Sequence, residues 1–187
     1  MDIPELVNIT SKAWALTVLA LLHSGVPGRQ APLLKASGAG RTAFTQSLDH
    51  LVEIGLLERN PGHGHPLRPE FRLTAAGKPA AALAHRILVD AGPGDPTLLR
   101  RTWTVPILVS LHRPRHFSEI KGDLPVITDR ALSQSLKSME ALDWVQRSVD
   151  DAARPPRPLY RAVNAGLRIS RAILPGISPY GSSSISQ

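Results

Sequence analysis

The stretch that decides the fold runs from Arg101 to Arg147, RTWTVPILVSLHRPRHFSEIKGDLPVITDRALSQSLKSMEALDWVQR. Apolar side chains recur with helical spacing between Ala131 and Leu142, where Leu132, Leu136 and Met139 fall at i, i+4 and i+7. These three residues share one face of the predicted helix. The opposite face carries polar side chains, many of them hydrogen-bond donors, which suit phosphates and base edges. We therefore predict a helix that is buried on one side and open to a partner on the other.

Shorter elements flank this helix. An apolar helix is predicted over Val105–Leu111, and a shorter one opens at Ser118. Strands are predicted at 144–147 and 159–161, on either side of a basic, proline-rich loop. The order helix, helix, helix, strand, loop, strand is that of a winged helix-turn-helix.

Composition narrows the class of protein. The 187 residues fit one large or two small domains. Lys and Arg number 22 against 15 Asp and Glu, and the net charge of +7 favours a polyanionic partner. The absence of cysteine excludes disulfides, thiolate zinc sites and a cysteine nucleophile. No run of 18 apolar residues and no signal-peptide pattern is evident, so we expect a cytoplasmic protein without a membrane span.

The same order of elements is predicted in the first half of the chain. After a short lead-in over residues 1–10, helices are expected at 12–23, 30–36 and 41–54 and strands at 56–59 and 70–73. Thr74 is a plausible N-cap for a last helix that reaches about Val89. Residues 90–96, DAGPGDP, have the composition of a linker.

The two halves also match residue by residue. Trp14 matches Trp103, Gly77 matches Gly166 and Phe71 matches Tyr160 at a spacing of 89, while the third helices and Arg59 with Arg147 match at 88. We therefore predict a mainly α fold with small β-wings (α+β), made of two tandem winged helix-turn-helix domains. The predicted boundaries are 1–90 for the first domain, 91–97 for the linker, 98–174 for the second domain and 175–187 for a disordered tail.

The second half resembles the HxlR-type branch of the bacterial, MarR-like winged-helix regulators. The resemblance covers about 70 residues and is carried by these segments: 103–104, 107–108, 115–120, 124–128, 132–136, 155–158 and 160–161. It implies sequence-specific binding of double-stranded DNA, usually as a dimer paired through terminal helices, and regulation of nearby genes. The sequence departs from the family in two ways. Many members have an N-terminal cysteine for redox sensing, which is missing here, and most have one winged helix per chain.

The candidate DNA-binding residues lie on the third helix and the wing of each half. In the second half they are Thr128, Arg130, Ser133, Gln134, Lys137, Arg154 and Arg157. In the first half they are Arg41, Thr42, Thr45, Gln46 and Arg68, with Asp49 and His50 on the same helix face. Asp49 takes the place of Lys137, and an acid is unfavourable beside a phosphate. Residues 93–187 carry a net charge of +5 against +2 for residues 1–92, so the second half is expected to bind more tightly.

The candidate residues also have explanations that involve no ligand. Polar side chains at helical spacing also occur on any solvated helix face. The pair His63 and His65 has no third ligand, and His112–His116 is expected to be a basic turn near phosphate, so neither a metal nor a cofactor is predicted. No catalytic constellation is evident, and an enzyme is not expected.

Two functions remain open at this level. The first is a DNA-binding transcriptional regulator, expected to be a repressor, that pairs as a homodimer or as a pseudo-dimer within one chain. The alternative is a tandem winged-helix adaptor for proteins, without sequence-specific readout of DNA. The sequence identifies neither the operator nor a small-molecule effector.

Overall fold

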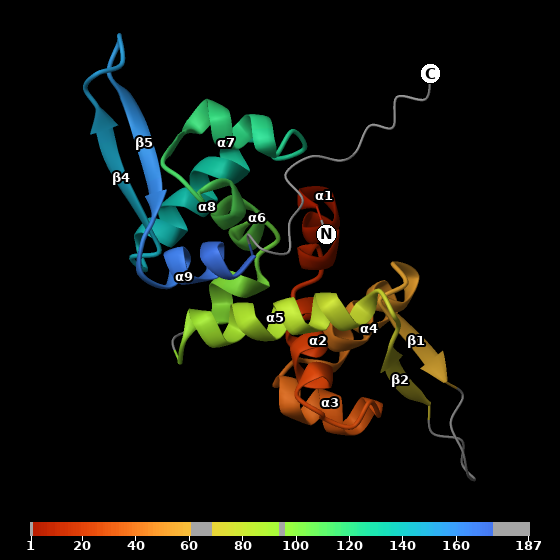
Figure 1. Cartoon of the computed structure of the whole chain (residues 1–187). Coiled ribbons are helices and arrows are strands. Elements are labelled where there is room, and N and C mark those ends of the chain that lie inside the picture. Colours follow the sequence, from red (N-terminus) through yellow and green to blue (C-terminus); the bar gives the residue numbers. More distant parts are fainter. Residues whose placement is uncertain (1, 61–68, 94–95, 174–187) are drawn as a thin grey trace, which may run out of the picture.

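The computed structural model describes residues 2–60, 69–93 and 96–173. Helices form most of the chain, and two small antiparallel sheets project from it (Figure 1). The elements of the first half are α1 (Ile3–Thr10), α2 (Ala15–His23), α3 (Gln30–Ser37), α4 (Arg41–Glu53), β1 (Leu57–Asn60), β2 (Glu70–Leu73) and α5 (Gly77–Ala91). Those of the second half are the 3-10 helix η1 (Pro96–Arg100), α6 (Thr104–Ser110), β3 (Arg115–His116), α7 (Phe117–Asp123), α8 (Asp129–Glu140), β4 (Val145–Asp150), β5 (Arg157–Ala162) and α9 (Asn164–Ile173).

This mixed α+β architecture fits the predicted winged helix-turn-helix. Strand β2 has the predicted bounds, and α4 begins at the predicted residue. The wing of the second half is more regular than predicted, because β4 and β5 extend to Asp150 and from Arg157 and leave only residues 151–156 between them. Strand β3 was not predicted; it pairs with β5 and gives the sheet order β3-β5-β4. Only two residues long, β3 offers no alternating pattern to detect.

Several helix boundaries differ from the prediction for local reasons. Residues 1–10 are not a simple lead-in, because Asp2 and Glu5 form a capping box that starts α1. Helix α7 begins at Phe117 rather than Ser118, with the His116 backbone N–H donating to Glu119 Oε2 at 2.7 Å. Helix α8 begins two residues earlier than predicted. The expected linker is partly helical, since α5 continues to Ala91 and η1 begins at Pro96.

The two halves share one hydrophobic core. Helix α5 packs against α2 of its own half and against α9 of the other, and the three lie side by side in Figure 1. Helix α1 packs against α6, where the Thr10 hydroxyl donates to Thr102 O at 2.8 Å. From the start of the second half, the Arg100 guanidinium lies over the Trp14 ring of the first half, 4.2 Å from its centroid. Each N-terminal segment therefore contacts the other half.

The bases of the β1–β2 and β4–β5 hairpins share the same backbone contacts. In the first half, Thr74 N donates to Leu56 O at 3.1 Å, and in the second half Val163 N donates to Trp144 O at 2.9 Å. The last helix of each half presses a glycine against that same carbonyl. A Cβ on Gly77 would collide with Leu56 O, and a Cβ on Gly166 would collide with Trp144 O. The matched glycines are thus required by close backbone approach.

No single helix in the described part of the chain is both long and apolar enough to cross a bilayer. Helices α1 and α2 pass such a test only as a pair, and they are bent by 98° at the break between them.

The glycine contacts lead to a stability prediction. Gly77→Ala and Gly166→Ala should each lower the free energy of unfolding by about 1–3 kcal/mol, because the new methyl group overpacks against a backbone carbonyl. Gly122→Ala is the matched control: it lies in α7 with no neighbour within 4 Å of the added Cβ. Helix propensity should make that substitution neutral or stabilising by up to about 1 kcal/mol. Urea unfolding followed by circular dichroism measures all three, and equal effects would refute the close-contact explanation.

Candidate nucleic-acid interface

Helix α8 is fixed on the domain by its apolar face and by its N-terminal cap. Leu132, Leu136 and Met139 are all buried, as the sequence predicted. Thr128 is the N-cap residue, and its hydroxyl oxygen accepts from Ala131 N at 3.2 Å. Thr128 therefore shapes the start of the helix in addition to lying on its exposed side.

The opposite face of α8 is open to a ligand. Arg130, Gln134 and Lys137 are exposed, and Ser133 is half-buried. Guanidinium, ammonium and amide groups at this spacing can donate to phosphates and to the acceptors of guanine and adenine in a major groove. The side chains that the sequence predicted on the polar face of α8 are thus accessible on one surface.

The turn before α8 is held by a lysine. Lys121 Nζ lies 3.1 Å from Asp129 Oδ1 and also donates to the backbone carbonyl of Ile127. These contacts join α7 to the first residue of α8 across the helix-turn-helix. They fix the angle at which α8 projects from the domain.

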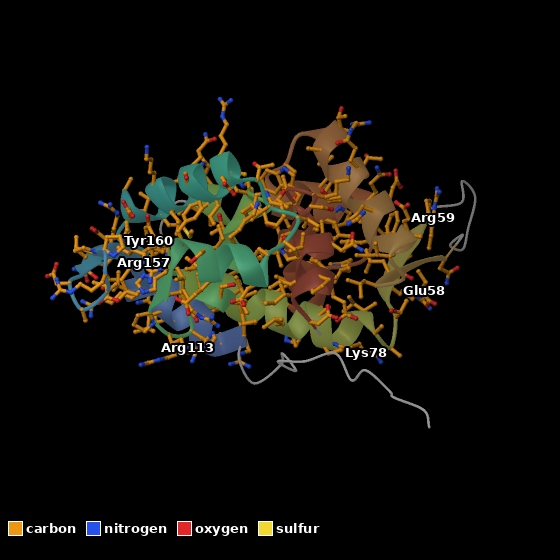
Figure 2. The ribbon with its side chains drawn as sticks, turned by 90° about the horizontal axis from the view of Figure 1, so that it is seen from above. Glu58, Arg59, Lys78, Arg113, Arg157 and Tyr160 are labelled. Atoms are coloured by element: carbon orange, nitrogen blue, oxygen red, sulfur yellow. The ribbon has the colours of Figure 1, made fainter. Side chains whose placement is uncertain are left out.

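The two arginines of the basic turn before α7 lie in different surroundings. Arg115 is mostly buried, with its guanidinium 3.7 Å from Glu119 and 3.4 Å from Asp123. The His116 backbone N–H beside Glu119, and then the Arg115 cation, lower the pKa of that carboxyl group below its ordinary value. Figure 2 places Arg113 near the edge opposite α8. Arg115 is therefore held by carboxylates of its own domain, whereas Arg113 is exposed, and the expected basic turn near phosphate at 112–116 stays a prediction.

A hollow of about 320 Å³ lies between α8 and the wing. It is lined by Ser133, Leu136, Lys137, Glu140, Arg147 and Tyr160. Two cations from different elements, Lys137 on α8 and Arg147 on β4, therefore border one concave surface. It lies beside the exposed face of α8, which we call the recognition face. Such an arrangement can hold a phosphate of a nucleic-acid backbone. Sequence reasoning did not single out Arg147 for this role, although its match with Arg59 was visible.

The wing carries the other predicted cations. Arg154 is exposed in the connection 151–156, whereas Arg157 is the first residue of β5 and pairs in register with Asp150. Further along the hairpin, Arg161 Nε donates to Gln146 Oε1 at 2.9 Å, so this guanidinium is oriented by its neighbour. The wing is thus a regular hairpin with cations at its tip and along its exposed side.

The corresponding face in the first half is weaker. Arg41, Thr42 and Gln46 are exposed on α4, and Thr45 is half-buried, but Asp49 shares this surface. His50 was expected on the exposed face and is instead 9% exposed, with its Nε2 2.8 Å from Asn8 O. A partner 42 residues away satisfies this imidazole, which sequence spacing cannot indicate. Arg68, His63 and His65 lie outside the described residues.

The hairpins of the two halves lie far apart in the protein. In Figure 2, α8 runs along the upper edge of the view and α5 along the lower edge. The two wings lie at opposite ends, marked by Arg157 at one and by Glu58 and Arg59 at the other. Within residues 2–60, 69–93 and 96–173, no group of three or more His, Cys, Asp or Glu side chains could hold a metal ion.

The three-helix core, the exposed third helix and the three-stranded wing define residues 98–173 as a winged helix-turn-helix. Residues 98–187 match the family model described as HxlR-like helix-turn-helix, so the second half carries an HxlR-like domain.

Among named proteins, the chain is 35% identical over 72 residues to the uncharacterized HTH-type transcriptional regulators Rv3095 of Mycobacterium tuberculosis (strain ATCC 25618 / H37Rv) and Mb3122 of Mycobacterium bovis (strain ATCC BAA-935 / AF2122/97). Each match covers 38% of this chain and 45% of the relative, so the chain spans less than half the length of these proteins. Among solved structures, it is similar to the reduced form of the transcriptional regulator YodB from B. subtilis. That match has 26% identity and a TM-score of 0.37, over 43% of this chain and 78% of the other.

The hollow beside α8 gives a prediction that depends on charge. Lys137→Ala and Arg147→Ala should each weaken binding to any duplex and reduce the slope of log affinity against log salt by about one, because each removes one phosphate contact. Fluorescence anisotropy with a labelled duplex at several salt concentrations measures both quantities. Lys78→Ala, on α5 at the opposite edge, removes the same charge and should leave the slope unchanged (Figure 2). A matching loss in Lys78→Ala would mean that only net charge matters.

Proposed function

We propose that this chain is a sequence-specific regulator of transcription that binds double-stranded DNA and acts as a repressor at the nucleoid. The observation that carries the proposal is the joint exposure of Arg130, Gln134 and Lys137 on α8, beside the cationic hollow, in an HxlR-like helix-turn-helix domain. Donors on the helix would read base edges, while Lys137 and Arg147 would hold the backbone. A protein bound across a promoter represses by occupying it, which requires no further activity.

We also propose that both halves are winged helices and that they form a pseudo-dimer within one chain. The boundaries are those predicted, 1–90 and 98–174 with a linker at 91–97. Support comes from the matched glycine contacts at Leu56 and Trp144 and from the packing of α5 against α9. Homodimerisation of the whole chain remains compatible with this arrangement. Tail residues 175–187 lie outside the described part of the chain.

The two half-sites should be unequal. If the halves are related by a pseudo-two-fold axis, their recognition helices address half-sites about 34 Å apart or a multiple of that distance. Asp49 on α4 stands where α8 has Lys137, so the half-site under α4 would be held less tightly and could use its acid to accept from cytosine. The operator is therefore expected to be an imperfect palindrome.

Paired substitutions test this asymmetry. Replacing Gln134 and Lys137 together by Ala should weaken operator binding by about tenfold or more, because a base contact and a phosphate contact are lost. Replacing Gln46 and Asp49 together by Ala should have a much smaller effect and can even improve binding by removing an acid. Equal losses from the two pairs would contradict the unequal half-sites. The operator itself is obtained by selecting bound duplexes from a random pool, which also reports the number and spacing of half-sites.

The duplex selection and the salt dependence of affinity also distinguish a DNA-binding regulator from a protein-binding adaptor. A DNA-binding protein should enrich a defined motif, and its affinity should fall steeply with salt. If no duplex is bound at low salt, the proposal fails and the tandem winged helices are better explained as a protein-binding module.

A further inference from the structure

A second hollow in the described part of the protein lies away from α8 and its wing. It has a volume of about 510 Å³ and is bordered by α1, the turn between α4 and β1, α5 and the end of α9. This volume falls within the range of about 300–1,000 Å³ that is typical of small-molecule sites. Its apolar lining includes Ile9, Ile54, Leu56, Ala80, Leu83 and Ala172.

The hollow exists because α5 presents small side chains to it. Ala76, Ala80 and Ala82 line it together with Pro79, so one wall consists of a helix with little side-chain volume. Ile54 and Leu56 remain only partly buried at this place, although both are apolar residues beside the shared core. Covering them with an apolar molecule would remove more hydrocarbon surface from water.

Charge at the rim indicates the kind of molecule. Arg86 lines the hollow and has no hydrogen bond or ion pair with any residue in the described part of the chain. The other charged rim residue, Glu5, already accepts from Asp2 N at 2.9 Å within the capping box of α1. The uncommitted charge is therefore the guanidinium, which prefers a carboxylate because both groups are planar and can form two parallel hydrogen bonds.

We propose that this hollow is an effector site for an organic acid with an apolar body, whose carboxylate pairs with Arg86 while its body covers Ile54, Leu56 and Leu83. Asn8, on the α1 wall, adds a polar residue to the lining. The binding step rests on the hollow and the cation alone. Its regulatory consequence rests on the proposed DNA-binding function.

The position of the hollow explains how a bound ligand would affect the DNA-binding faces without touching them. Its walls belong to both halves, because Ala172 comes from α9 and the other lining residues from the first half. Helix α1 packs against α6, the Thr10 hydroxyl donates to Thr102 O just before α6, and α5 packs against α9. A molecule inserted between α1, α5 and α9 would favour one relative position of the halves and hence one spacing of α4 and α8.

The binding step is tested on the full chain by isothermal titration calorimetry. Three acids with different apolar bodies are the probes: 4-phenylbutyrate, octanoate and 1-naphthaleneacetate, each compared with its neutral alcohol. At least one acid should bind with a Kd of about 1 mM or tighter and about tenfold more tightly than its alcohol. Failure of all three acids, or equal affinity of acid and alcohol, overturns the proposal.

Variants identify the site. Arg86→Gln should weaken the acid by about tenfold and leave the alcohol unchanged, since only the ion pair is lost. Ala82→Leu, at a half-buried lining position, should fill the hollow and weaken both. Lys78→Gln, on the same helix outside the lining, is the charge control and should bind like the original protein. Unchanged binding in both Arg86→Gln and Ala82→Leu would place the acid elsewhere and overturn the assignment.

The regulatory step is tested separately with the selected operator duplex. A saturating acid should change duplex affinity by about fivefold or more, and Arg86→Gln should lose the response at that concentration. Acid binding without any change in duplex affinity overturns the effector role but leaves the site. Absence of duplex binding with or without acid refutes the proposed function, and the calorimetry still decides the site.

Discussion

The packing of α5 against both α2 and α9 is the interaction on which the rest of the structure depends. Because α5 buries small residues, Ala80, Ala81 and Ala84, neighbouring helices can approach its backbone closely. This helix therefore closes the core of its own half and also forms the contact with the other half. The orientation of α4 and α8 relative to each other follows from that shared contact.

Local pattern was enough to predict much of the fold. The 3.6-residue period identified the buried face of α8, and the basic, proline-rich loop between two short strands indicated the wing of the second half, because each signal is contained within a short segment. Local pattern did not indicate the partners of side chains that contact other elements of the fold. His50 has the spacing of an exposed residue but bonds to Asn8, and Arg115 belongs to a basic run but is neutralised by Asp123. Neither partnership is encoded in helical periodicity.

The candidate interface was predictable in kind and less so in detail. Exposed positions on α8 follow directly from the buried ones, whereas the hollow beside them depends on how far the wing lies from the helix. Arg147 is a candidate phosphate contact only because the fold brings β4 to the same hollow as Lys137. By sequence match, the first half has Asp49 and Arg59 at the positions of Lys137 and Arg147, so the two halves carry different charges there. Two halves with similar backbones can therefore differ in the ligands that they bind.

The joining of α5 and α9 within one chain has a consequence for gene dosage. Two separate subunits must find each other before a palindrome can be occupied, and at a few copies per cell most of them would be apart. Here the paired arrangement is intramolecular, so it does not dissociate on dilution. For the proposed pseudo-dimer, promoter occupancy would then rise in simple proportion to the amount of protein, and a cell could set it with very low expression.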